Sequence, residues 1–122
     1  MSRDATGLRS ALDDVRALRA EFWSDLRIAG GADQLNQELE RAGRVADYLE
    51  LAELMCIDAL DRDESCGAHF RAEHQTSGGE AVRNDDQWRF TSAWEPGADG
   101  VPVRRAEPLE FARVPLRVRD YR

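Results

Sequence analysis

Hydrophobic residues recur every three or four positions in the first part of the chain. Between residues 6 and 27 they form a single stripe made of Leu8, Leu12, Val15, Leu18, Phe22 and Leu26. This spacing follows the 3.6-residue period of an α-helix, so the pattern predicts a helix over residues 6–27. Thr6 or Asp4 can cap its start, and Gly30 and Gly31 mark its end.

A second helix is predicted over residues 33–61, with Asp33 as its N-cap. One face of this helix carries Leu35, Leu39, Ala42, Ala46, Leu49, Cys56 and Leu60. Further apolar residues lie off that face, namely Leu51, Leu54, Met55 and Ile57. A helix that is apolar on several sides is expected to be buried on several sides. Gly43 is a weak point in the helix, where a kink or a close helix crossing would fit.

Residues 61–86 are polar and contain only two large apolar residues, Phe70 and Val82. The composition predicts a long loop, and loops of this length are uncommon in compact domains unless they have a function or lie against another surface. Because the segment has so few apolar residues, we expect it to need contacts and hydrogen-bond partners from outside the chain. We therefore interpret residues 61–86 as a docking loop.

The last part of the chain has the two-residue period of β-strands. Trp88, Phe90 and Trp94 alternate with polar residues, and glycines at positions 97 and 100 supply turns. Leu109 and Phe111 resume the alternation, which then shifts by one position at Val114, Leu116 and Val118, near Pro115. The pattern predicts a β-hairpin over residues 87–118 with a break in its second half.

These elements predict a mainly α fold in a single domain over residues 1–122. It consists of a helical bundle of two long helices, with room for a third short one, followed by the docking loop and the C-terminal hairpin. Two long helices and one hairpin can form only a small core, but the chain has three Trp and four Phe residues. The apolar surplus indicates a surface meant for a partner. A modest α+β domain that buries the surplus internally remains the alternative.

The charge distribution excludes one class of partner. The chain carries a net charge of −7 and has no lysine. Six arginines and three acidic residues give residues 101–122 a net charge of +3, so residues 1–100 carry −10. An acidic body repels phosphate groups, which argues against nucleic acid as a partner. The sequence contains no apolar run long enough to span a membrane and no signal-peptide pattern, so we expect a cytoplasmic protein without direct membrane insertion.

The residues that could carry chemistry favour structural roles. Cys66, His69 and His74 have the ligand types of a zinc site, but the fourth candidate, Cys56, lies on the apolar face of the second predicted helix. His69 could pair with a nearby carboxylate, from Asp63, Glu64 or Glu73, and Ser65 could be a nucleophile. The strand-to-helix turn that activates such a serine is absent, and no glycine pair follows a strand as a dinucleotide site requires. We therefore expect no catalytic, cofactor-binding or metal-binding residue.

A resemblance to a known family rests on two stretches. Residues 62–71 contain Arg62, Glu64, Ser65, Gly67, His69 and Arg71, and residues 83–88 read Arg-Asn-Asp-Asp-Gln-Trp. Together they resemble the R-x-E-S-x-G-x-H and R-D-D-E-x-[WF] motifs near the C-terminus of succinate dehydrogenase and fumarate reductase flavoproteins. Further stretches are similar to the same family in the same order, at residues 21–23, 36–39, 42–47, 49–55, 93–95, 107–111 and 119–122. Cys66 stands where many members have Arg, and Asn84 and Gln87 are small departures.

The resemblance implies an N-terminally truncated flavoprotein. In the family, an FAD-binding domain and a capping domain precede this part and hold FAD and the substrate, and Met1 falls at an internal methionine that starts a helix. None of the family's flavin or substrate residues maps onto this sequence, so the resemblance implies no cofactor in this chain. It implies as partners the FAD and capping domains and an iron–sulfur subunit. The expected location is the cytoplasm, with a peripheral position at the inner face of the membrane through that complex.

The resemblance also implies a role. The chain would be a scaffold and interaction domain of an enzyme that interconverts succinate and fumarate and transfers electrons, and it would be inactive alone. Its structural interface residues would be Glu64, Ser65, Gly67, His69, Arg71, Asp85, Asp86 and Trp88. An independent small binding or assembly protein derived from that domain is the alternative hypothesis.

Overall fold

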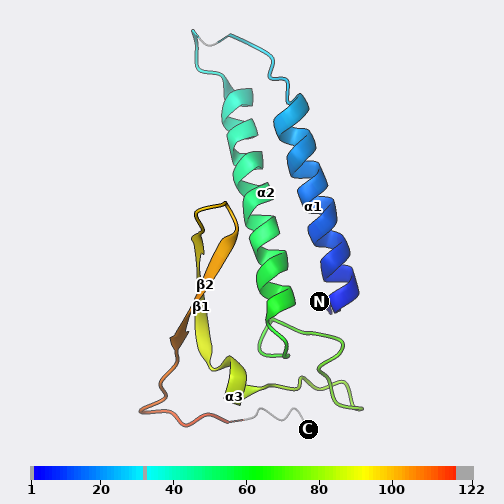
Figure 1. The fold of residues 1–122 in the computed structure, drawn as a ribbon, viewed down its shortest axis with the longest axis vertical. Coiled ribbons are helices and arrows are strands. Elements are labelled where there is room, and N and C mark those ends of the chain that lie inside the picture. The colour runs from blue at the N-terminus through cyan, green and yellow to red at the C-terminus, as the bar shows by residue number, and fades with distance from the viewer. Residues whose placement is uncertain (1, 32, 118–122) are drawn as a thin grey trace. The chain divides into compact units, whose positions relative to one another are not determined.

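A computed structural model describes residues 2–31 and 33–117. Along the chain they form three helices and two strands, in the order α1, α2, α3, β1 and β2 (Figure 1). Two helices are long, one is short and the strands form a small antiparallel hairpin, which confirms the predicted mainly α fold class. The chain divides into two compact units, Met1–Arg83 and Asn84–Arg122, and each is described by itself.

The first helix, α1 (Ala5–Asp25), begins where the sequence supplies a cap. The side chain of Asp4 accepts a hydrogen bond of 2.7 Å from the backbone N–H of Gly7, so Asp4 and not Thr6 is the N-cap. The helix ends two residues before the predicted boundary at residue 27, and its last bond runs from the N–H of Leu26 to the carbonyl of Phe22.

The second helix, α2 (Gln37–Asp61), begins later than predicted. The expected N-cap at Asp33 is wrong, because the side chain of Asn36 accepts hydrogen bonds from the backbone N–H groups of Glu38 and Leu39. Asn36 also donates a 3.0 Å bond to the carbonyl of Ala29, just beyond α1. Asn36 therefore both starts α2 and fixes the loop between the two long helices.

Helices α1 and α2 run antiparallel beside each other, and their apolar seam contains one polar layer (Figure 1). Leu8 and Leu12 of α1 are buried, as is Leu49 of α2. Further along the seam the carboxylate of Glu53 accepts bonds of 2.8 Å from both Arg16 and Arg19, and its side chain is only 14% exposed. Leu18, predicted to belong to the buried stripe, is 53% exposed.

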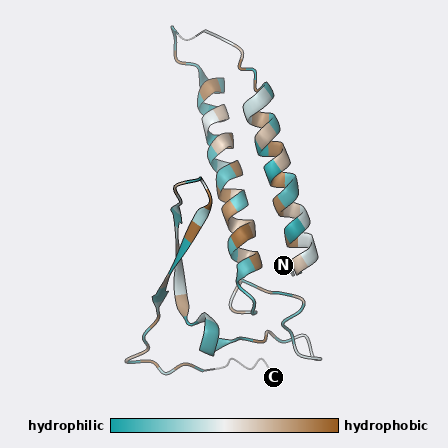
Figure 2. Ribbon diagram, in the orientation of Figure 1, coloured by the Kyte–Doolittle hydropathy of each residue, from teal (hydrophilic) through white to brown (hydrophobic). Residues whose placement is uncertain are grey.

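Both long helices leave large apolar side chains exposed, and Figure 2 shows hydrophobic positions, in brown, along both of them. Their exposed large apolar residues are Leu18, Trp23, Leu39, Val45, Tyr48, Leu51 and Met55, and Leu26 and Leu35 follow in the intervening loop. This matches the surplus of apolar surface expected from the sequence. No helix of the described residues has the length and hydropathy needed to cross a membrane.

The second unit contains α3 (Asp85–Trp88) and a hairpin of β1 (Phe90–Pro96) and β2 (Pro102–Pro108). The strands pair antiparallel, with Phe90 opposite Pro108 and Trp94 opposite Arg104. A tight turn ends at Gly100, whose φ of +76° favours glycine.

The second strand does not lie where the apolar alternation placed it. Leu109 and Phe111 follow β2 and belong to no strand. The turn at residues 97–100 fixes the register, so that β1 pairs with the less apolar residues 102–108. Val118 of the predicted hairpin, and the family-like ending at residues 119–122, lie outside the described residues.

Candidate functional site

The most deeply buried side chains in the described residues are polar, and they lie in the predicted docking loop. Ser65 has 0% exposed surface, and Glu64 and Arg71 are also buried. Burying polar groups is unfavourable unless they are hydrogen-bonded, so such burial indicates a specific network. We call residues 62–82, which carry this network, the polar segment.

Ser65 and Arg71 form the centre of the polar segment. The Ser65 hydroxyl accepts a 2.8 Å bond from the backbone N–H of Arg71 and donates a 3.1 Å bond to the Arg71 carbonyl. These bonds direct the hydroxyl at the backbone and give Ser65 no geometry of a nucleophile held by His69.

The guanidinium group of Arg71 ties the polar segment to the end of α2. Its Nη1 atom donates to the carbonyl oxygens of Ala59 and Leu60 at 3.2 and 3.3 Å. The last carbonyls of a helix have no partner within the helix, so Arg71 satisfies groups that would otherwise be buried without one. Ion pairs with Glu73 at 3.3 Å and Asp63 at 3.6 Å balance its charge.

Glu64 is held by the arginine that follows α2. Arg62 donates to one Glu64 carboxylate oxygen through two nitrogen atoms, Nε at 2.9 Å and Nη2 at 2.7 Å. Burying a carboxyl group is unfavourable unless it is paired and hydrogen-bonded. The partner of Glu64 thus comes from the chain itself.

His69 is placed as a neutral hydrogen-bonding group. Its Nε2 atom lies 2.9 Å from the Arg62 carbonyl and its Nδ1 atom lies 3.4 Å from Arg3 Nη1. A carbonyl can only accept and a guanidinium can only donate, so the neutral ring with its proton on Nε2 fits both contacts. Burial lowers the pKa of His69 below 6.5, and the positive charges of Arg3, Arg62 and Arg71 lower it further.

The polar segment also holds the N-terminal residues. The backbone of Arg3 donates to Phe70 at 3.0 Å and accepts from Ala72 at 2.7 Å. Two residues along, the N–H of Ala5 donates a 2.5 Å bond to the Glu73 carboxylate. This bond and the nearby Arg71 lower the pKa of Glu73 to about 2. Sequence reasoning missed the role of Arg3, which no motif marks.

The expectation that only another domain could supply partners for the polar segment is therefore wrong. Glu64, Ser65 and His69 all bond to groups within the first unit. The segment also pairs with itself, since the backbone N–H of Ser65 donates to the carbonyl of Val82 at 2.9 Å and that of Val82 donates to the carbonyl of His74 at 3.0 Å. Gly67, with a φ of +60°, forms the turn between Cys66 and His69. Hydrogen bonds to and within the backbone therefore hold the polar segment in place, a role that packed apolar side chains do not fill here.

The other three predicted interface residues lie in the second unit. Asp85 and Asp86 occupy the first turn of α3, which Asn84 caps by accepting from the N–H of Gln87. Trp88 ends this helix, and its ring lies 5.4 Å from that of Phe90, with the guanidinium of Arg104 over both rings at 5.4 and 4.9 Å. The indole N–H of Trp88 is buried without a hydrogen-bond partner among the described residues.

The remaining candidates do not assemble into a reactive site. His74 bonds to Asp63 at 2.7 Å and Cys66 exchanges backbone bonds with His69. In residues 2–31 and 33–117, no three side chains of the metal-binding types gather in one place.

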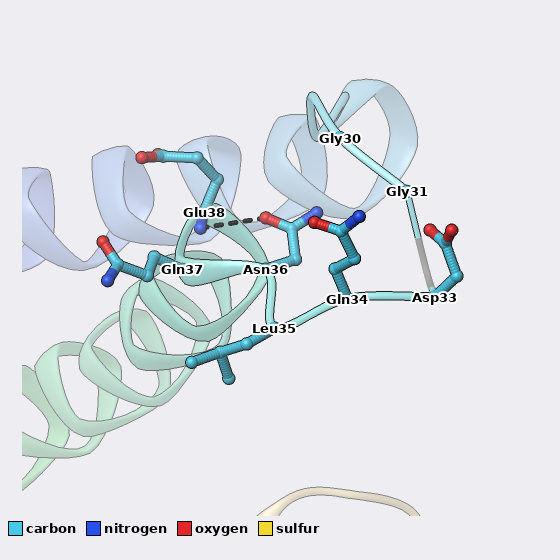
Figure 3. Close-up of a pocket in the computed structure, with 8 residues that line it drawn as sticks. All are labelled: Gly30, Gly31, Asp33, Gln34, Leu35, Asn36, Gln37 and Glu38. Carbon is cyan, nitrogen blue, oxygen red and sulfur yellow. Dashed lines mark hydrogen bonds between the residues drawn. The ribbon is translucent and has the colours of Figure 1, made fainter.

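A hollow at the start of α2 is lined by residues of the loop between the long helices (Figure 3). Helix starts can attract anions through their unpaired N–H groups. Here Asn36 already accepts from Glu38 and Leu39, and the side chains of Asp33 and Glu38 add negative charge at the rim. Gly30 and Gly31 follow a helix instead of a strand, so the hollow does not have the features of a phosphate site.

Comparisons with known proteins agree with this geometry. The profile of the family described as "Fumarate reductase flavoprotein C-term" matches residues 1–121. The fumarate reductase flavoprotein subunits of Helicobacter pylori strains 26695 and J99 are each 28% identical over 116 residues, which is 93% of this chain and 15% of theirs. A solved structure of a variant of the E. coli quinol fumarate reductase shares the fold, with a TM-score of 0.78 and 24% identity over 93% of this chain and 19% of that one. The chain thus spans less than a fifth of the length of these relatives. A match over nearly every residue, with the same fold, shows that the chain belongs to the fumarate reductase flavoprotein C-terminal family.

Proposed function

We propose that the chain is a scaffold and interaction domain of a succinate dehydrogenase or fumarate reductase flavoprotein and has no catalytic activity alone. The observation that carries this proposal is the family match over residues 1–121 combined with relatives that are several times longer. The proposed partners are the FAD and capping domains of such a flavoprotein and its iron–sulfur subunit. Through that complex the chain would lie at the inner face of the cytoplasmic membrane.

The geometry of the polar segment supports a scaffold role. Ser65, His69 and Arg71 are used in bonds that hold the end of α2 and the N-terminal residues together. These residues would keep an interface in shape, while exposed residues such as Gly67 and Asp86 would contact the partner. The eight residues from Glu64 to Trp88 that the motifs single out remain our proposal for that interface.

The described residues do not fit an FAD site. Dinucleotide sites place a glycine-rich turn between a parallel strand and a helix, where backbone N–H groups meet the pyrophosphate. The two strands described here form only an antiparallel hairpin, and Gly78 and Gly79 lie in a turn of the polar segment. In this proposal FAD binds to the preceding domains of the flavoprotein.

The test is purification of the tagged chain from its native host under mild conditions. We expect a polypeptide that contains FAD and an iron–sulfur protein to copurify in fixed ratio. The chain purified alone after expression in another host should lack the flavin absorbance band and should not oxidise succinate. A stoichiometric flavin band in that sample, or a native preparation without either partner, would contradict the proposal.

The self-contained bonding of the polar segment favours a second candidate. A segment that satisfies its own buried groups does not need another domain to fold, as expected of an independent small binding or assembly protein. The native purification separates the two hypotheses. An independent protein would be isolated without the flavin-containing polypeptide, or in a variable ratio to it.

A further inference from the structure

Residues 2–4, which we call the N-terminal strap, are attached to the polar segment through Arg3. The backbone N–H of Arg3 donates to the carbonyl of Phe70 at 3.0 Å, and the N–H of Ala72 donates to the carbonyl of Arg3 at 2.7 Å. The side chain of Arg3 reaches the ring of His69, the residue directly before Phe70 in the sequence. Arg3 therefore holds the strap both by its backbone and by its side chain.

The contact between Arg3 and His69 is attractive only while the imidazole ring is neutral. The Nε2 atom donates its proton to the carbonyl of Arg62 at 2.9 Å, which leaves the lone pair of Nδ1 to accept from Nη1 of Arg3 at 3.4 Å. A second proton would be carried by Nδ1, so that two donors and two positive charges would face each other. Protonation therefore turns this contact into a repulsive one.

Positive charges face His69 from three parts of the first unit. Arg3 belongs to the strap, Arg62 follows α2 and Arg71 lies in the polar segment. Burial has the largest effect on the ring and lowers its pKa below 6.5, against the opposing effect of the bond to the Arg62 carbonyl, and the three arginines lower the pKa further. The ring therefore gains its second proton only in acid.

The negative charges in this region balance Arg62 and Arg71 and leave Arg3 without a counter-charge. The carboxylates that bind those two arginines are Asp63, Glu64 and Glu73. Arg3 forms no ion pair in the part of the chain that the structure describes, and its guanidinium has there a single side-chain hydrogen bond, to His69. A protonated ring would thus leave the side chain of Arg3 without an attractive side-chain partner.

We propose that protonation of His69 releases the N-terminal strap from the polar segment. The side chain of Arg3 moves away from the ring, and its two backbone bonds open with it, because they form an isolated bridge with no neighbouring pair to support it. The start of α1 stays in place. Ala5 donates to the carboxylate of Glu73, whose pKa of about 2 keeps it ionised when His69 titrates. The strap is thus an acid-sensitive latch, and it does not depend on the flavoprotein partners.

A pH titration followed by NMR tests the release. The ring signals of His69 report its protonation, and hydrogen exchange at Ala72 reports the attachment of the strap, with each rate divided by that of an unprotected N–H at the same pH. As the ring titrates between pH 7.5 and 4.5, the protection of Ala72 should fall to that of the exposed Ser77, while Ser65 stays protected. An equal loss at Ser65 would mean that the whole unit opens. That result, a ring that stays neutral down to pH 4.5, or an Ala72 that stays protected on the charged ring would overturn the proposal.

Substitution of Arg3 tests the sign of the effect. Arg3→Lys keeps a cation beside Nδ1 of His69 and should preserve the release. Arg3→Glu places a carboxylate there, so protonation should strengthen the attachment and the protection of Ala72 should rise in acid. The control is His74→Gln, because His74 is the other histidine of the polar segment and bonds to Asp63 instead of the strap. It should release the strap as the unchanged chain does, and circular dichroism verifies that the helices of each variant are intact. If Arg3→Glu loses the protection of Ala72 in acid, or if His74→Gln abolishes the release, the latch is not formed by Arg3 and His69.

Discussion

Ser65 shows how a single polar residue can take the place of an apolar core residue. Its side chain is fully buried, and its hydroxyl uses its donor and one acceptor position on the backbone of Arg71. Both bonds join Ser65 to Arg71, so they hold the two ends of residues 65–71 together. Ser65, which by residue type could be a nucleophile, therefore serves to order the backbone.

We predict that Ser65→Ala lowers the free energy of unfolding by about 1 to 3 kcal/mol, because it leaves the buried N–H of Arg71 without its partner. The Arg71 carbonyl keeps the bond from the backbone N–H of His74. Urea denaturation followed by circular dichroism measures the change. Ser77→Ala is the control, since Ser77 lies exposed in the same segment. An unchanged denaturation midpoint for Ser65→Ala would mean that the hydroxyl does not stabilise the polar segment.

Two glycines are predicted to respond to alanine in opposite directions. Gly43 lies inside α2, and a Cβ atom there would meet nothing within 4 Å, so neither a kink nor a close crossing requires glycine. Gly43→Ala should stabilise the chain by about 1 kcal/mol through higher helix propensity. Gly67 also has open space but a φ of +60°, so Gly67→Ala should destabilise by about 1 to 2 kcal/mol. Thermal unfolding of the two variants side by side checks both signs.

At the scale of elements, the two long helices meet in a seam with a seven-residue repeat. In α1 the repeat places Arg19 between Val15 and Phe22, and in α2 it places Glu53 between Leu49 and Cys56. Arg19 and Glu53 meet at 2.8 Å and form a polar layer in an otherwise apolar seam. Such a layer fixes the register of two helices, since any shift would bury a charge without its partner.

We predict that Glu53→Gln lowers the free energy of unfolding by about 1 to 2 kcal/mol at pH 7, because Arg16 and Arg19 lose a shared carboxylate. Hydrogen bonds from Arg16, and then Arg19, lower the pKa of Glu53 below 4.5. The carboxylate therefore contributes its stability above the pKa of the unfolded chain and loses it as the pH falls through the lower folded value. The difference between the variant and the unchanged chain should shrink in acid. A difference independent of pH would contradict the ionic origin.

The sequence predicted both long helices correctly because their apolar residues repeat over more than five turns. It did not predict their exact limits. Asp33 and Asn36 are both good N-caps, and the contact of Asn36 with the carbonyl of Ala29 decides between them. The position of Leu18 shows the same limit. The apolar pattern places Leu18 in the seam, but in the structure Leu18 is exposed and Arg19 occupies the seam, where it pairs with Glu53 of α2.

The pattern of apolar residues could not predict that the polar segment is ordered. Phe70 and Val82 are too few to predict a packed structure, and the partners that hold Arg71 are backbone carbonyls, which no side-chain pattern reveals. The family motif did single out Glu64, Ser65, His69 and Arg71, which the structure brings together. The motif does not include Arg3, which reaches the polar segment only because the fold brings the N-terminal residues beside Phe70 and Ala72.

At the scale of the whole chain, His69 links segments that are far apart in the sequence. Its pKa is lowered chiefly by burial, so the folded chain holds it neutral while the unfolded chain binds a proton near its ordinary value of 6.5. As the pH falls below 6.5 the unfolded state gains this proton first, and stability decreases until the folded pKa is reached. His69→Gln should remove that part of the pH dependence. Urea midpoints at pH 7.5 and 5.5 measure it, and an equal drop in both proteins would exclude His69 as the cause.

The last prediction concerns which parts of the chain fold without a partner. In the polar segment the backbone N–H groups of Ser65, Ala72 and Val82 donate to carbonyls of residues 82, 3 and 74, so their bonds depend on the tertiary fold of the first unit. If the segment is self-sufficient, these three N–H groups should exchange with solvent slowly, at rates close to those of the seam residues of α1 and α2. The two-stranded hairpin of the second unit should exchange faster, because an isolated pair of strands is marginally stable in water.

Hydrogen exchange of the purified chain, read by NMR at single residues, measures all of these rates together. Gly67 is exposed and lies in the turn between Cys66 and His69, so its N–H serves as the internal reference for fast exchange. Slow exchange at Ser65, Ala72 and Val82 would establish that polar contacts alone order the segment, which favours a domain able to fold independently. Exchange as fast as at Gly67 would mean that these bonds form only when a larger flavoprotein surrounds the segment, since its few apolar residues cannot otherwise offset the entropy of ordering it.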